Sequence, residues 1–227
     1  MNRIIPILIV AVIVAAGAGY WLTQSNGQAN AQQTQIERVS ASGGDSAAAT
    51  DTSGVIEMVM GSNDAPVTVI EYASFTCPHC ATFHENVLKP LKADYIETGK
   101  VKFIFRDVYF DRFGLWASMV ARCAGPDKFF GMTDLLMKGQ SEWTRAGDPV
   151  AIAGELRKVG RLAGIEDAAL QACMQDEDKA KQLVAWYEKN VAEHDISGTP
   201  ALIINGEKHS NMSYADLKKI LDEKLAQ

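Results

Sequence analysis

The feature of this sequence that most constrains its fold is a pair of cysteines two residues apart, placed between a buried strand and a helix. Residues 67–73, Val-Thr-Val-Ile-Glu-Tyr-Ala, predict a largely buried strand. Cys77-Pro78-His79-Cys80 follows, and apolar residues then recur at helical spacing. Proline suits the first turn of a helix, because the N–H that it lacks has no partner there. The tetrapeptide therefore predicts a helix start with Cys77 at the N-cap.

This position has consequences for the chemistry of the two thiols. Backbone N–H groups at a helix start point towards an N-cap sulfur and favour its thiolate form. We expect Cys77 to be exposed and Cys80 to lie one turn further on, within disulfide distance. A protonated His79 would add positive charge beside Cys77. These effects stabilise the reduced pair, so the sequence predicts an oxidising disulfide with Cys77 as the attacking residue and Cys80 as the resolving residue.

A zinc site is the main alternative for these residues, because Cys-x-x-Cys alone is a weak signal. His84 follows Cys80 by four residues and would share its helical face. Cys77, Cys80 and His84 could thus supply three ligands. No fourth ligand is evident in the sequence, and Pro78 fits the start of a redox helix. The sequence favours dithiol chemistry and predicts neither a metal nor a bound cofactor.

A second signal is Gly198-Thr199-Pro200, immediately before a short apolar stretch at residues 201–204. Because cis peptide bonds are nearly confined to X-Pro, we predict one between Thr199 and Pro200. Packed against Cys77, it would turn the Thr199 backbone towards a substrate chain. An ordinary trans proline that opens a strand is the alternative.

The order of the remaining elements predicts an α/β protein. The pattern indicates strands at 67–73, 101–106 and 201–204, helices across about 113–173, over roughly 178–193 and at 214–225 after the cap Ser213, and a hairpin at Asn205-Gly206. A β-α-β start with a later hairpin and closing helix predicts a mixed sheet flanked by helices.

The N-terminal part differs in composition from the rest. Residues 1–23 combine Arg3 with an uncharged apolar run, which predicts an export signal. Cleavage and retention as a membrane anchor both stay open, because the run is almost long enough to span a bilayer. Residues 24–54 predict a flexible polar linker before a domain at 55–227. A net charge of −6 without a basic cluster argues against a nucleic-acid partner.

The other two cysteines, Cys123 and Cys173, lie fifty residues apart in the predicted helical block and belong to no local motif. An exported chain with an even cysteine count permits disulfides. We expect a structural disulfide between them, with two free buried thiols as the alternative.

Together these residues resemble the DsbA family of periplasmic thiol:disulfide oxidoreductases. The resemblance spans about 55–227 and is carried by Phe75-Thr76-Cys77-Pro78-His79-Cys80, the mid-chain helices and Gly198-Thr199-Pro200. It implies a thioredoxin fold with a helical domain inserted at about 112–177. It also implies that the Cys77–Cys80 disulfide passes to reduced cysteines of exported proteins through a mixed disulfide at Cys77.

The resemblance further implies a periplasmic location and two kinds of partner. These are reduced or unfolded exported proteins and a quinone-linked membrane oxidase of DsbB type, which reoxidises the dithiol. We expect a monomer, since residues 24–54 are too short and polar to form a dimerisation domain. A disulfide isomerase or reductase of the same fold, and a non-catalytic zinc or peptide-binding module, are the alternative functions.

Three further residues bear on the site through the resemblance. Glu71 matches an acidic residue that relatives carry six positions before the first cysteine, and a Glu in an apolar strand is costly unless it has a task. We predict that it accepts the Cys80 proton, with a structural role as the alternative. Thr199 replaces the Val of typical DsbA oxidases, and His84, beside Glu85, replaces an acidic residue.

Apolar side chains near the motif are candidates for a platform that binds unfolded peptides. They are Phe75, Phe110, Phe113 and Trp116. The interpretation that we favour is that most of them belong to the core.

Overall fold

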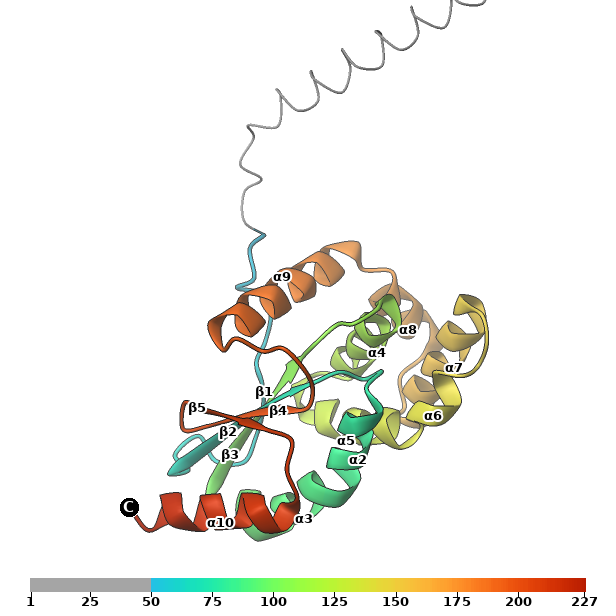
Figure 1. Cartoon of the computed structure of the whole chain (residues 1–227). Coiled ribbons are helices and arrows are strands. Elements are labelled where there is room, and N and C mark those ends of the chain that lie inside the picture. Colours follow the sequence, from blue (N-terminus) through green and yellow to red (C-terminus); the bar gives the residue numbers. More distant parts are fainter. Residues whose placement is uncertain (1–49) are drawn as a thin grey trace, which may run out of the picture. The chain divides into compact units, whose positions relative to one another are not determined.

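The computed structural model describes residues 50–227 (Figure 1). The predicted signal segment 1–23 and most of the predicted linker 24–54 lie outside the described residues. Across 50–227, no helix combines the length and apolar character needed to cross a bilayer.

A mixed five-stranded sheet forms the centre of the domain. In sheet order its strands are β1 (Met58–Met60), β3 (Val101–Asp107), β2 (Val67–Ala73), β4 (Ala201–Ile204) and β5 (Glu207–Ser210). Only β2 and β3 pair in parallel, and the other neighbours are antiparallel. The mixed α/β sheet and the thioredoxin fold are thus confirmed.

The strand β1 was not predicted. It pairs antiparallel with β3 at the sheet edge, where Met58 lies opposite Phe105. Three residues are too few to show the alternation by which a strand is found in a sequence.

Helices cover both faces of the sheet. The helix after the cysteine motif comprises α2 (Pro78–Phe83), η1 (His84–Leu88), α3 (Lys89–Leu91) and η2 (Lys92–Ile96), and it lies on the same face as α10 (Tyr214–Leu225). The two η segments are π-helical turns on either side of Pro90, which cannot donate a regular helical hydrogen bond. On the other face, α9 (Glu177–Glu193) packs Tyr187 and Val191 against Tyr72 of β2.

A block of five helices follows β3 and precedes α9 in the chain, and it lies to one side of the sheet (Figure 1). Its members are α4 (Arg112–Cys123), α5 (Pro126–Lys138), α6 (Gln140–Trp143), α7 (Pro149–Leu162) and α8 (Asp167–Met174). Buried Phe129 and Leu156 join this block to the core under the sheet. The block therefore forms one wall beside the cysteine motif.

A disulfide joins Cys123 at the end of α4 to Cys173 in α8, with 5.9 Å between the Cα atoms. Replacing both residues by Ala is expected to lower the free energy of unfolding by about 2–4 kcal/mol, because the bond restricts a long loop of the unfolded chain. Urea denaturation of the oxidised protein and the variant measures the difference. Equal unfolding midpoints and slopes would show that the disulfide contributes nothing to stability.

Candidate active site

The cysteine motif forms the start of α2. Cys77 is the N-cap with an extended backbone, and Pro78 occupies the first helical position, as the sequence predicts. Both thiols are free, and Cys80 is completely buried. The expectation that Cys77 is exposed was wrong, since only 8% of its surface is accessible.

The segment at Thr199 explains this burial. The peptide bond between Thr199 and Pro200 is cis, so the trans alternative does not apply. The Thr199 carbonyl oxygen lies 3.5 Å from the Cys77 sulfur and accepts a hydrogen bond from it only when Cys77 is protonated. A segment 122 residues away in the chain thus covers Cys77.

The surroundings make the two thiols chemically unequal. The largest effect on the pKa of Cys77 is a hydrogen bond from the Cys80 thiol, which lowers it. The Thr199 side chain and the backbone N–H groups of Cys80 and His79 lower it further. Together these effects outweigh burial and bring the pKa of Cys77 to about 5. The same hydrogen bond, burial and the charge of Glu71 raise the pKa of Cys80 far above its usual range. The reduced pair is therefore a Cys77 thiolate beside a Cys80 thiol. The His79 side chain is exposed to solvent.

The loop before the motif is fixed by Gln140 of α6, which the sequence did not reveal. Its buried side-chain NH₂ group donates to the carbonyl oxygens of Phe75 (2.8 Å) and Cys77 (2.9 Å). The helical block thereby holds the N-terminus of α2 in place. No local pattern marks a glutamine more than sixty residues from its partners, so this role could not be predicted.

Glu71 lies under the motif on the α2 side of the sheet. It shares this face with Val67 and Val69, because side chains alternate along a strand. One carboxylate oxygen, Oε2, lies 2.9 Å from Nε2 of His84, while Oε1 has no hydrogen-bond partner among the described residues. The charge of Glu71 contributes to the raised pKa of Cys80.

The structure pairs His84 with Glu71 of β2. The imidazole binds the carboxylate rather than completing a site with the two cysteines. Within 50–227, no three His, Cys, Asp or Glu side chains are grouped as metal ligands. His84 lies thirteen positions after Glu71 in the chain, and the two residues belong to different elements, β2 and η1. Their pairing therefore results from the tertiary fold.

The four candidates for a peptide-binding platform lie in different environments. Phe75 is buried, Phe113 and Trp116 are half-buried with Arg112 stacked on both rings, and Phe110 is 58% exposed. The start of α4 approaches the motif closely, because a Cβ at Gly114 would lie 3.4 Å from Ser74 Oγ. The site thus has one strongly exposed aromatic side chain in this group.

Comparison with known proteins gives a consistent result. A family model described as Thioredoxin matches residues 53–223. A Rickettsia bellii protein named "Putative protein-disulfide oxidoreductase" is 30% identical over 168 residues, which cover 74% of this chain and 64% of that protein. The chain therefore spans less than two thirds of this relative's length.

Two further relatives are similar over most of their length. Disulfide bond formation protein D of Bacillus subtilis is 28% identical over 74% of this chain and 76% of its own. The crystal structure of Wolbachia pipientis alpha-DsbA1 superimposes with a TM-score of 0.69 at 25% identity, covering 75% of this chain and 91% of that one.

Proposed function

The chain belongs to the DsbA-like branch of the thioredoxin family, and from this premise we propose that it is a thiol:disulfide oxidoreductase that donates the Cys77–Cys80 disulfide to reduced cysteines of exported proteins. The observation that carries the proposal is the placement of the two thiols, with Cys77 as the N-cap of α2 and Cys80 completely buried behind it. Cys77 is stable as a thiolate, whereas Cys80 is stable as a buried thiol. These properties stabilise the reduced form of the two cysteines. The Cys77–Cys80 disulfide of the oxidised form is therefore transferred readily to a substrate.

The reaction begins when a substrate thiolate attacks the Cys77 sulfur of the disulfide. The Cys77–Cys80 bond breaks, a mixed disulfide forms at Cys77, and Cys80 takes up a proton. A second substrate thiolate then attacks the substrate sulfur of the mixed disulfide. Cys77 leaves as a thiolate, and its low pKa makes it a good leaving group.

Thr199 and Pro200 would position the substrate chain at Cys77. The contact between the Thr199 carbonyl oxygen and the Cys77 sulfur supports this role, since it places this backbone beside the atom that a substrate thiolate attacks. His79 contributes its backbone N–H to the thiolate, and its exposed ring lies beside the approach of a substrate.

A surface pocket of about 580 Å³ next to α2 suits a polypeptide substrate. Its lining combines apolar side chains with the amides of two asparagines; the residues include Phe83, Asn86, Val87, Asn211, Met212 and Tyr214. Phe83 and Val87 are almost completely buried, so Met212 and Tyr214 supply most of the apolar surface that a substrate side chain could contact.

The family also suggests the setting of the reaction. We infer a periplasmic domain, exported by the segment at residues 1–23, and reoxidised by a quinone-linked membrane oxidase of DsbB type. The chain would act as a monomer, with residues 24–54 as a linker and residues 112–177 as an inserted helical domain.

Titration of the Cys77–Cys80 couple against glutathione tests the direction of the reaction. We expect a potential well above the value of about −270 mV that is typical of thioredoxin, because the reduced form carries a stabilised thiolate. A potential close to that of thioredoxin would favour a reductase instead.

A further inference from the structure

We propose that the buried Glu71–His84 pair carries the Cys80 proton between the protein interior and solvent, with His84 as the group that exchanges with water. This inference rests on the oxidoreductase function proposed above. It assigns to His84 a role in proton transfer at the resolving cysteine.

The need for such a path follows from the burial of Cys80. Its thiol must lose a proton when it attacks a mixed disulfide, and its thiolate must gain one when the Cys77–Cys80 bond opens. No surface of Cys80 is accessible to solvent. Its raised pKa makes a free thiolate unfavourable at neutral pH, so a proton acceptor must act during the attack.

Glu71 has the properties of this acceptor. It is fully buried, and its Oε1 atom has no hydrogen-bond partner among the described residues. A buried carboxylate oxygen without a hydrogen-bond partner is unfavourable, because it has lost its hydration. Protonation of this oxygen neutralises the charge and so reduces the desolvation penalty. A buried carboxylate cannot release this proton to water directly, however, and its other oxygen faces His84.

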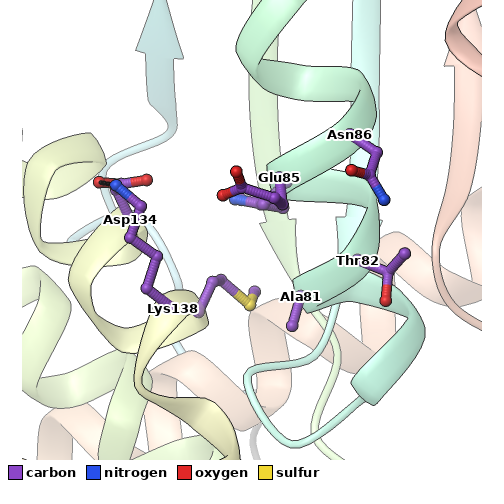
Figure 2. Close-up of a pocket in the computed structure, with 8 residues that line it drawn as sticks. Ala81, Thr82, Glu85, Asn86, Asp134 and Lys138 are labelled. Atoms are coloured by element: carbon purple, nitrogen blue, oxygen red, sulfur yellow. Dashed lines mark hydrogen bonds and ion pairs between the residues drawn. The ribbon is translucent and has the colours of Figure 1, made fainter.

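His84 connects that carboxylate to solvent. Its side chain is 6% exposed and borders two pockets, of about 330 Å³ and about 300 Å³. Figure 2 shows the first pocket, where Glu85 of η1 extends towards Asp134 and Lys138 of α5. Water in either pocket can therefore meet the imidazole.

The groups around His84 leave Glu71 as its charged partner in the interior. The ring of Phe83 in α2 and the ring of Phe105 in β3 both pack against the imidazole. On the solvent side the pocket charges occur as neutral pairs: Lys89 with Glu85, and Lys138 with Asp134. Lys92, which borders the second pocket, approaches Glu97.

The protons balance in each direction. In the reduced protein, Glu71 is a carboxylate and His84 an imidazolium beside the Cys80 thiol. During reoxidation by a disulfide donor, Cys77 first forms a mixed disulfide with the donor. No hydrogen bond joins the Cys80 sulfur to Glu71 Oε1, so the Cys80 proton passes to Oε1 through one bridging water molecule. Cys80 then attacks the Cys77 sulfur, the Cys77–Cys80 bond forms and the donor thiolate leaves. His84 releases its Nδ1 proton to pocket water and becomes neutral.

Substrate oxidation reverses these transfers. The departing Cys80 thiolate takes the Glu71 proton, and His84 takes one from water. The pair thus holds a single net proton in both states, as an ion pair when the protein is reduced and as a neutral pair when it is oxidised. The Glu71–His84 pair therefore carries no net charge in either the reduced or the oxidised protein.

The first test uses the unmodified full chain. Imidazole ¹⁵N NMR at neutral pH, with the His84 signals assigned from a His84→Gln spectrum or from backbone connectivities, reports the protonation of His84 in each redox state. We expect an imidazolium in the reduced protein and a neutral ring in the oxidised protein. The same protonation in both states would overturn the proposal.

The second test separates the two chemical steps with oxidised glutathione as the donor. In H84Q, we expect the Cys77 mixed disulfide to form at the normal rate but to resolve roughly 10²-fold more slowly, the range of general acid–base catalysis. H194Q is the matched control, because His194 contacts Tyr72 and belongs to no part of this path.

The outcomes of the second test are distinct. An unchanged resolving rate in H84Q would overturn the proton path while leaving the oxidoreductase function intact. A protein that forms no mixed disulfide at all would instead overturn the proposed function. If H84Q does not fold, the NMR measurement on the unmodified chain decides the question.

Discussion

Replacing Cys77 with Ser is expected to abolish disulfide transfer and to reduce the rate to that of the uncatalysed reaction. The hydroxyl cannot form a disulfide, and Cys80 cannot take over because it is completely buried. The assay contains oxidised glutathione as the disulfide donor and a reduced peptide with two cysteines as the substrate. Mass spectrometry measures the rate at which the peptide is oxidised. No smaller effect is compatible with Cys77 as the residue that forms the mixed disulfide.

The matched control for this experiment is the variant with Ser at both Cys123 and Cys173. These residues form the disulfide between α4 and α8 and have no part in the proposed reaction. We expect the control to retain transfer wherever it remains folded. Disulfide transfer by C77S at the normal rate would exclude Cys77 as the reactive thiol. A non-catalytic binding module would likewise keep its binding activity after the substitution.

Replacing Cys80 with Ala is expected to stop the reaction after its first step. Cys77 still attacks a disulfide donor, but no second thiol remains to resolve the mixed disulfide. About one equivalent of covalent adduct should therefore accumulate at Cys77, and mass spectrometry would detect it. A C80A protein that completes turnover would show that another group resolves the intermediate.

The same variant has a second expected effect, on the pKa of Cys77. The hydrogen bond from Cys80 is the largest effect that lowers this pKa, so its loss should raise the value and slow alkylation of Cys77 in mildly acidic solution. The lowered pKa of Cys77 also makes the stability of the reduced protein depend on pH. A depressed pKa stabilises the reduced folded protein at high pH, and this contribution is lost as the pH falls through about 5.

Features with a local cause were predictable from the sequence. Pro78 marked the start of α2 and so placed Cys77 at the N-cap. Asn205 and Gly206 have the positive φ angles of a tight hairpin turn, and Ser213 caps α10 with its side chain. Each of these features depends on neighbours within a few residues, which a sequence pattern records directly.

Features that depend on distant segments were predicted only in part. The burial of Cys77 results from Thr199, and the fixed loop before it results from Gln140. Gly198-Thr199-Pro200 predicted the contact with Cys77, although not the burial that results from it. The Gln140 contact has no sequence signature, because the fold alone brings Gln140 to this loop. The resemblance indicated the place of Glu71 near the site, but not that His84 would pair with it.

The most direct test of the central claim is a pH titration of the Cys77 thiolate in the reduced full chain. The rate of alkylation by iodoacetamide reports this thiolate, since Cys80 is buried and the other two cysteines are joined in a disulfide. A C77S sample supplies the background. The structure predicts a midpoint at about pH 5. A midpoint near 8.5, the ordinary value for cysteine, would contradict it.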